Sequence, residues 1–171
     1  IRERVYQRVR GGEGLVLVHP QLGMDESDRK LWEVSPLVNL PSTKLGRRAR
    51  YLVGDFNTFA FDAEYDVAVS SLALHHLATD ADKRGFYRRI YDALVPGGVF
   101  YNADVVLGSS DALQAMYMQK WQAFMRQNVS RGEMENTWLP KYYDEDRPAR
   151  LTDHLAWLDQ VGFTDVDVVW K

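Results

Sequence analysis

Two adjacent histidines, His75 and His76, follow an apolar run that is typical of a buried strand. An imidazole exchanges its proton near neutral pH, so a histidine in this turn could act as a general base. The pair could equally shape the turn and a pocket beside it. Neighbouring side chains diverge, so the two histidines alone make a poor metal site and no metal site is predicted. The sequence leaves the catalytic residue unknown, with His76 as a weak candidate.

Asp55 is a further candidate for a binding role. It ends the run ARYLVGD, residues 49–55, which reads as a strand that stops at a glycine and an acid. Open α/β sheets hold their ligands at the carboxyl ends of their strands, which is where Asp55 falls. The alternative is a loop acid that caps the next turn, and the sequence does not decide between the two.

The histidine turn lies inside a continuous pattern of strand, helix and strand. Residues 66–70 are apolar without polar alternation, as expected of a strand that is covered on both faces. A helix follows from Thr79, where Asp82 completes a capping box. Pro96-Gly97-Gly98 ends this helix, and a second strand covers residues 99–103. The three elements make a βαβ unit, so the two strands should be parallel.

Similar patterns extend on both sides of this unit. Residues 15–18 read as another short buried strand. Near the other end, a last helix with Thr152 as its cap ends at Gly162, before a final strand at residues 166–170. Alternating strands and helices with buried strands predict an open α/β sheet.

Residues 111–150 predict a helical, aromatic insertion or lid, because this segment is too aromatic for a free linker. Its long helix carries methionine and aromatic side chains at helical spacing, a pattern more typical of a core than of a ligand pocket. This face comprises Leu113, Met116, Tyr117, Trp121, Phe124 and Met125.

Length and composition exclude several classes of function. At 171 residues the chain has the length of one domain, and its 46% hydrophobic and 26% charged residues are ordinary for a globular protein. It has no cysteine, which excludes disulfides and thiolate nucleophiles. A net charge of −3 gives no electrostatic reason to propose nucleic acid or an anionic membrane as partner. No apolar run reaches the roughly 18 residues of a membrane span, and no signal-peptide pattern appears. The absence of cysteine leaves the compartment open, and a cytoplasmic location is the default expectation.

Residues 49–170 resemble the class I S-adenosylmethionine-dependent methyltransferases. Four motifs, in this order and spacing, carry the resemblance. They are Val53-Gly54-Asp55-Phe56 at a strand end, the strand and turn from Tyr65 to Leu77, the Leu94-Val95-Pro96-Gly97-Gly98-Val99-Phe100 turn, and the helix end Leu158-Asp159-Gln160-Val161-Gly162-Phe163.

The resemblance implies a doubly wound, mostly parallel α/β sheet of the Rossmann-like methyltransferase type. Cofactor and substrate would lie across the carboxyl ends of its strands. The whole chain, residues 1–171, would be a single methyltransferase-like domain with residues 111–150 as the insertion or lid. The N-terminal part of the sheet and its last strand could be incomplete.

The resemblance also implies a cofactor, S-adenosyl-L-methionine, and the residues that would bind it. Asp55 would bind the adenine amino group, and Phe56 would lie beside the adenine ring. Glu33 resembles the acid that holds the ribose hydroxyls. Ser70 and Ser71 would approach the methionine moiety, mainly through their backbone.

The same resemblance positions the methyl acceptor. His75 and His76 would open the wall near the transferred methyl, and Asp104 would contact the substrate. The aromatic segment from Tyr117 to Tyr143, which includes Trp121, would be the lid that selects the acceptor. The implied partner is a small-molecule acceptor, with no nucleic acid and no membrane, and a homodimer could form.

One element of the family's pattern is not recognisable. A glycine-rich loop should follow the first strand, but residues 19–23 contain a single glycine, Gly23. Leu15 to Glu33 covers 19 residues, whereas a βαβ unit takes roughly 30.

Three functions therefore stay open. The leading one is methyl transfer to a small-molecule acceptor. The second is a non-catalytic methyltransferase-like binding domain that has lost the cofactor loop. The third is another Rossmann-like enzyme that uses a dinucleotide, although the sequence lacks a G-x-G-x-x-G motif.

Overall fold

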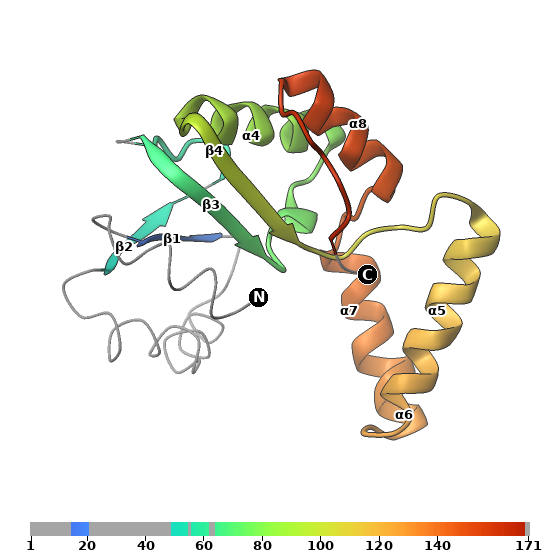
Figure 1. The fold of residues 1–171 in the computed structure, drawn as a ribbon. Helices are drawn as coiled ribbons and strands as arrows, with labels where there is room; N and C mark the ends of the chain where they lie inside the picture. Colours follow the sequence, from blue (N-terminus) through green and yellow to red (C-terminus); the bar gives the residue numbers. More distant parts are fainter. Residues whose placement is uncertain (1–14, 21–48, 55, 62–63, 170–171) are drawn as a thin grey trace. The chain divides into compact units, whose positions relative to one another are not determined.

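A computed structural model describes residues 15–20, 49–54, 56–61 and 64–169 (Figure 1). The chain divides into two compact units, Ile1–Phe59 and Ala60–Lys171, and each unit is described by itself. In the described residues, each unit contains one parallel pair of strands. The single domain predicted for the whole chain stays a prediction.

The first unit contains strands β1 (Leu15–Pro20) and β2 (Ala49–Gly54). They pair in parallel, and their register is continuous along all six residues of each strand. Both strands predicted from the sequence are confirmed. Residues 21–48, which connect the two strands, lie outside the described residues; Glu33 lies among them, and Asp55 is also outside.

The second unit contains the predicted βαβ arrangement. Strand β3 (Tyr65–Ser71), helix α4 (Asp80–Ala93) and strand β4 (Leu94–Ala103) follow one another, and the strands pair in parallel. At the carboxyl ends, Ser71 lies opposite Ala103. Both strands therefore deliver the residues that follow them to the same edge of the sheet.

Helix α4 begins with the predicted capping box. Thr79 Oγ1 accepts a hydrogen bond from the Asp82 N–H at 3.1 Å, and the Asp82 carboxylate accepts one from the Thr79 N–H at 3.0 Å. Both N–H groups would otherwise lack a partner at the start of the helix. One face of α4 is buried, and it consists of Lys83, Phe86, Tyr87, Ile90 and Ala93.

The second strand of the unit begins earlier than predicted. Helix α4 ends at Ala93 and β4 begins directly at Leu94, whereas the prediction had put its start at Val99. Pro96-Gly97-Gly98 lies inside the strand, where the pairing register with β3 shifts. Gly97 has a φ of +81°, which residues with a side chain rarely adopt, so this segment is an irregularity in the strand and not a separate turn.

Helix α8 (Leu151–Val161) packs beside α4 (Figure 1). Phe100 of β4 contacts both helical segments, because its ring centroid lies 5.8 Å from that of Tyr87 in α4 and 6.0 Å from that of Phe163 after α8. As predicted, α8 ends at Gly162, which has a left-handed conformation. The core of the second unit therefore lies between these helices and β4.

Two predictions for the C-terminal segment are wrong. The residue before α8 is Arg150, which is held by a backbone bridge, so Thr152 lies within the helix and does not cap it. Residues 166–169 do not form the expected strand. The Asp167 carboxylate instead accepts a hydrogen bond from the Val168 N–H at 2.7 Å, and such local bonds compete with strand pairing.

Between β4 and α8 the chain leaves the sheet and returns to it. We call residues 108–149 the arm. Its elements are α5 (Asp111–Met125), α6 (Arg131–Glu133), the π-helical turn η4 (Met134–Trp138) and α7 (Leu139–Glu145) (Figure 1). The two ends of the arm meet where Leu107 bridges to Arg150. Residues 111–150 thus contain helices, and their role as an insertion or lid stays a prediction.

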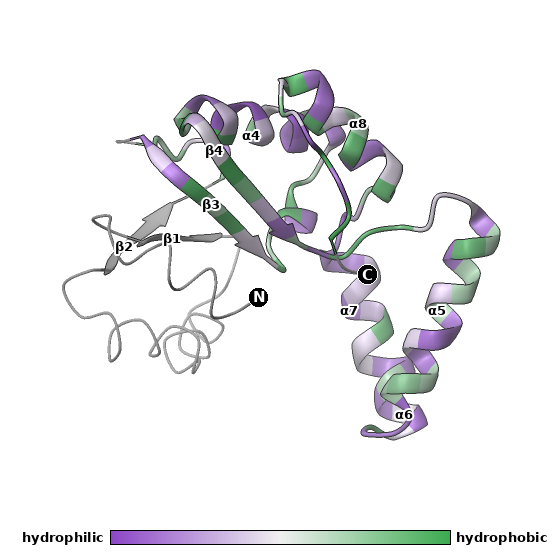
Figure 2. Ribbon diagram, in the orientation of Figure 1, coloured by the Kyte–Doolittle hydropathy of each residue, from purple (hydrophilic) through white to green (hydrophobic). Residues whose placement is uncertain are grey.

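The apolar face of α5 does not form the predicted core. Met125 is buried, but Leu113, Met116 and Phe124 are 36%, 37% and 62% exposed. Figure 2 shows that α5 carries hydrophobic residues along its length while it extends away from the β3–β4 pair. The interpretation of this face as part of a core is wrong, because the arm carries the face away from the sheet. None of the helices in the described part of the chain has the length and apolar character that crossing a bilayer requires.

A buried polar pair lies inside the core of the second unit. His154 of α8 is 5% exposed, and its Nδ1 lies 2.6 Å from the Tyr87 hydroxyl oxygen. Burial lowers the pKa of His154, an effect that the Asp104 carboxylate partly opposes. Burial also raises the pKa of Tyr87. Both side chains are therefore neutral at pH 7.

Gly162→Ala is expected to lower the free energy of unfolding by about 1 kcal/mol or more. Gly162 has a φ of +119°, and an added Cβ would lie 3.1 Å from the Tyr91 ring. Gly85→Ala is the matched control, because Gly85 lies within α4 and an added Cβ would meet nothing within 4 Å. This control should stabilise the protein by about 0.5–1 kcal/mol. Equal urea midpoints for the two variants would contradict the left-handed end of α8.

The free energy of unfolding should fall as the pH drops below about 6.5, where histidines of the unfolded chain take up protons. The pKa of His154 is lowered in the folded state, so its contribution is present above that pH and is lost as the pH falls towards the folded pKa. His154→Gln should remove this part of the pH dependence. Denaturant unfolding at about pH 7.5 and about pH 5.5 measures it. If the free energy of unfolding of the variant depended on pH as strongly as that of the wild type, the expectation would be contradicted.

Candidate functional site

The turn after β3 is tied to the end of β4. Leu72 has a φ of +50°, a left-handed conformation that is strained for leucine. Its N–H donates a hydrogen bond to the Ala103 carbonyl at 2.8 Å. The 3₁₀ turn η3 (Leu74–His76) follows. Leu74 and Leu77 are 1% and 3% exposed, so they anchor the histidine turn in the core.

A buried lysine supports the same turn from α4. Lys83 is 1% exposed, and its Nζ donates a hydrogen bond to the Leu77 carbonyl at 2.5 Å. Burial lowers the pKa of Lys83, while Asp80 and Asp82 at the start of α4 oppose this effect. The bond fixes the backbone just after the histidines. No sequence pattern indicates this role, because lysine on a helix is usually solvated.

His75 and Asp104 form the inner part of the site. His75 is 5% exposed, and its Nδ1 lies 2.5 Å from Asp104 Oδ1. The Asp104 side chain is 1% exposed, and the same oxygen accepts a hydrogen bond from the Val105 N–H at 2.9 Å. A carboxylate can only accept, so Nδ1 of His75 carries the proton in this bond. In the neutral imidazole, Nε2 is then left with a free lone pair.

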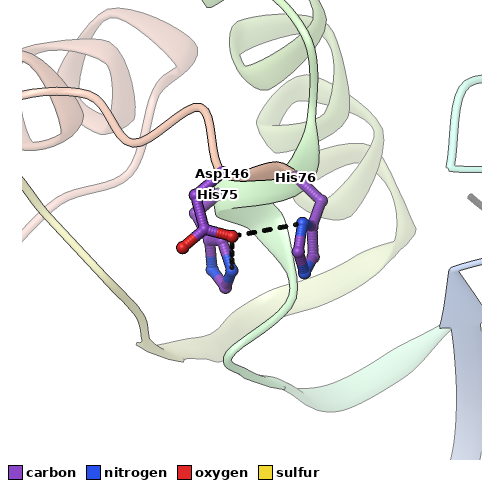
Figure 3. Close-up of side chains that lie close together, drawn as sticks. All are labelled: His75, His76 and Asp146. Carbon is purple, nitrogen blue, oxygen red and sulfur yellow. Dashed lines mark ion pairs between the residues drawn. The ribbon is translucent and has the colours of Figure 1, made fainter. Parts of the chain in front are cut away.

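A third side chain comes from the end of the arm. Asp146 follows α7, and its Oδ1 lies 3.4 Å from His75 Nε2 and 3.7 Å from His76 Nδ1 (Figure 3). The Arg147 N–H donates a hydrogen bond to the His75 carbonyl at 2.9 Å, which holds this segment against the turn. The two imidazole centroids are 4.1 Å apart. The expectation that the neighbouring side chains diverge is therefore wrong, because both rings lie against Asp146.

The other predicted cofactor residues lie in different parts of the chain. Ser70 is half-buried in β3, and its Oγ is a buried atom without a hydrogen-bond partner in the described structure. Ser71 is exposed at the end of β3. Phe56 is buried, but it belongs to the first unit. Glu33 and Asp55 lie outside the described residues.

The predicted acceptor residues Tyr117 and Trp121 lie on α5, and both are half-buried. The Trp121 ring centroid lies 5.2 Å from that of Tyr142, so α5 and α7 contact each other through aromatic side chains. Tyr142 precedes Asp146 by about one helical turn. These aromatics therefore support the segment that carries Asp146.

Asp146 is the site residue that the sequence reasoning missed. It belongs to an acidic run, Asp144-Glu145-Asp146, which reads as part of a polar insertion. Asp144 and Glu145 are exposed, whereas the Asp146 side chain is 17% exposed. No pattern in the run distinguishes its last member, because the approach to the histidines depends on the path of the arm.

A family model described as a methyltransferase domain matches residues 20–102. The matched segment contains β2, β3, η3 and α4, together with β4 up to Asn102. It therefore includes both histidines and ends just before Asp104. No curated protein sequence matches the chain significantly.

Solved structures of methyltransferases are similar to the chain. The S-adenosylmethionine-dependent methyltransferase SibL in its apo form has a TM-score of 0.60 at 18% identity, over 98% of this chain and 42% of that one. An O-methyltransferase family 2 protein from Planctomyces limnophilus, in complex with apigenin, has a TM-score of 0.59 at 17% identity, over 97% and 41%. PigF with SAH has a TM-score of 0.54 at 15% identity, over 95% and 42%.

The chain spans about two-fifths of the length of these three proteins. At these identities the likeness is one of fold, and it confirms the α/β class predicted from the sequence. Residues 20–102 therefore match a methyltransferase-domain family, and the chain has the Rossmann-like methyltransferase fold.

Proposed function

We propose that this chain transfers a methyl group from S-adenosyl-L-methionine to a small-molecule acceptor. The observation that carries the proposal is the methyltransferase-domain match over residues 20–102. The buried His75–Asp104 pair supports it, because the pair lies where two parallel strands of that segment end. Ligands of open α/β sheets bind at such strand ends.

His75 is the residue that we propose for proton transfer, in preference to His76. The Asp104 carboxylate holds the Nδ1–H, which fixes the tautomer and leaves Nε2 able to accept a proton from the acceptor's hydroxyl or amine. His76 is more exposed, and its Nδ1 lies 3.4 Å from the Glu145 carbonyl. Asp104 was predicted to contact the substrate, but its side chain is 1% exposed, so we propose that it acts through His75 as a positioning residue.

The cofactor would supply an electrophilic methyl group on its sulfonium. We propose that Glu33, Asp55 and Phe56 bind its nucleoside part and that Ser70 and Ser71 meet its methionine part. The buried Ser70 Oγ fits this role, because it is a donor without a partner in the described structure. PigF, one of the similar structures, was solved with SAH. Most of the rate would come from aligning acceptor, methyl and sulfur.

We propose that the aromatic side chains of the arm, Tyr117 and Trp121 among them, cover a small organic acceptor. The similar protein from Planctomyces limnophilus was solved with apigenin, a small molecule. The net charge of −3 gives no support for nucleic acid as a substrate. A cytoplasmic location, a homodimer and the absence of a membrane partner stay predictions.

A measurement of cofactor binding distinguishes the proposed enzyme from the alternative, a non-catalytic binding domain. Calorimetric titration of the full chain with S-adenosylhomocysteine should give saturable heat. Asp55→Ala should weaken the affinity about tenfold to a hundredfold, because it removes a hydrogen bond to a charged group. Asp159→Ala, at an exposed position of α8, should leave the affinity unchanged. Absence of heat at millimolar ligand would reject the enzyme and favour the binding domain that has lost its cofactor.

His75→Gln should reduce the turnover number for methyl transfer by about a hundredfold or more, because it removes the proton acceptor. Asp104→Asn should reduce the turnover number too, since the amide no longer holds the Nδ1–H. Transfer of a labelled methyl group to apigenin and simple phenols measures both effects. The affinity for S-adenosylhomocysteine and the melting temperature serve as controls for folding. Unchanged turnover of the His75 variant would rule out the assigned role.

A further inference from the structure

Three side chains that can offer a metal ligand atom converge at the outer side of the histidine turn. Asp146 Oδ1 lies 3.4 Å from His75 Nε2 and 3.7 Å from His76 Nδ1. One ligand atom of each of the three residues lies within 4.8 Å of the other two. Figure 3 shows the Asp146 carboxylate next to both imidazole rings. We call these three residues the His-His-Asp cluster.

The contact between His75 and Asp146 favours a bound cation. His75 gives its Nδ1–H to Asp104, so in the neutral ring Nε2 presents a lone pair to the Asp146 oxygen. A lone pair facing a carboxylate oxygen at this distance is repulsive. His76 Nδ1 lies near the same Asp146 oxygen and 3.4 Å from the Glu145 carbonyl. A metal ion between His75 Nε2 and the Asp146 carboxylate turns the repulsion into attraction.

We propose that the His-His-Asp cluster binds a divalent transition-metal ion of the Zn²⁺ type. Imidazole nitrogens and a carboxylate oxygen are the ligands that Zn²⁺ takes together, and ligands of a tetrahedral Zn²⁺ lie about 3.3–3.5 Å apart. The distances from Asp146 Oδ1 to His75 Nε2 and His76 Nδ1 are 3.4 and 3.7 Å, so small movements of the side chains suffice. Three protein ligands leave the fourth position open.

Asp104 completes the site from the buried side. A metal-binding histidine usually donates its other ring N–H to a carboxylate, which fixes the ring and raises its basicity. His75 does this through its 2.5 Å contact with Asp104, whose side chain is 1% exposed. His76 and Asp146 are 24% and 17% exposed, so an ion can enter from their side. The inner pair need not move when the ion binds.

The metal site overlaps with the proposed methyl transfer. A bound ion would occupy His75 Nε2, the atom that would accept the proton, so metal binding would regulate the reaction at that same site; this consequence rests on the proposed function. Binding of the metal itself does not require S-adenosylmethionine. The two proposals can therefore fail separately.

The test is a titration of the metal-free full chain with Zn²⁺ by calorimetry and with Co²⁺ by visible absorption. We expect one equivalent of metal, and for Co²⁺ the intense bands of a tetrahedral ion. Asp146→Asn and His76→Ala should each weaken Zn²⁺ binding at least tenfold, about the least that loss of a supporting partner causes. Asp104→Asn should weaken it about tenfold to a hundredfold. Asp144→Asn, which changes an exposed acid of the same helix, should leave binding unchanged.

Absence of metal binding at micromolar to millimolar Zn²⁺ would overturn the proposal. Equal Zn²⁺ affinity of the Asp146→Asn and Asp144→Asn variants would also overturn it, since the ion would then lie elsewhere. Melting temperatures of all variants show that they are folded. Calorimetry with S-adenosylhomocysteine on the same samples tests the proposed methyl transfer independently.

Discussion

The parallel pairing of β3 with β4 is the constraint on which the site depends. Ser71 lies opposite Ala103, so the histidine turn and Asp104 emerge at the same edge of the sheet. Only this register brings His75 within 2.5 Å of an acid that follows a different strand. A slip of one residue would point the side chains of one strand to the opposite face. Helix α4 secures the register, because its buried face packs on β4 through Tyr87 and the capping box fixes where the helix begins.

The polar side chains behind the site are buried, and their hydrogen bonds are therefore shielded from competing water. Lys83 gives a short hydrogen bond to the Leu77 carbonyl, and Tyr87 and His154 bond each other as neutral groups. Buried polar groups are stable only when they are paired, so these contacts restrict how the core can pack. The histidine turn thus rests on a rigid layer, while Asp146 reaches it from the more exposed arm. The inner half of the site is preorganised, and the outer half depends on the arm.

The βαβ unit could be predicted from the sequence because its determinants are local: the capping box at Thr79, an apolar strand and the apolar face of α4. That His75 and Asp104 share an edge follows from parallel pairing, but their contact depends on the exact register. Asp146 could not be predicted, since its position depends on the tertiary path of the arm. The prediction that the apolar face of α5 forms part of a core was wrong, because periodicity indicates that a face is hydrophobic but does not indicate what covers it. The prediction of the final strand failed for a related reason, because the Asp167 carboxylate accepts a hydrogen bond from the neighbouring Val168 N–H instead.

The bridge between Leu107 and Arg150 has a consequence for how such a protein can diversify. The Leu107 N–H donates to the Ala149 carbonyl at 2.8 Å, and the Leu151 N–H donates to the Leu107 carbonyl at 3.3 Å, so the arm leaves and re-enters the second unit at one point. Insertions or deletions inside the arm need not shift α8 or the strand ends. Evolution can therefore exchange the arm, and Asp146 with it, on an unchanged frame that keeps His75 against Asp104. Because the arm is closed at its base, its length and its side chains can change while the rest of the second unit stays the same.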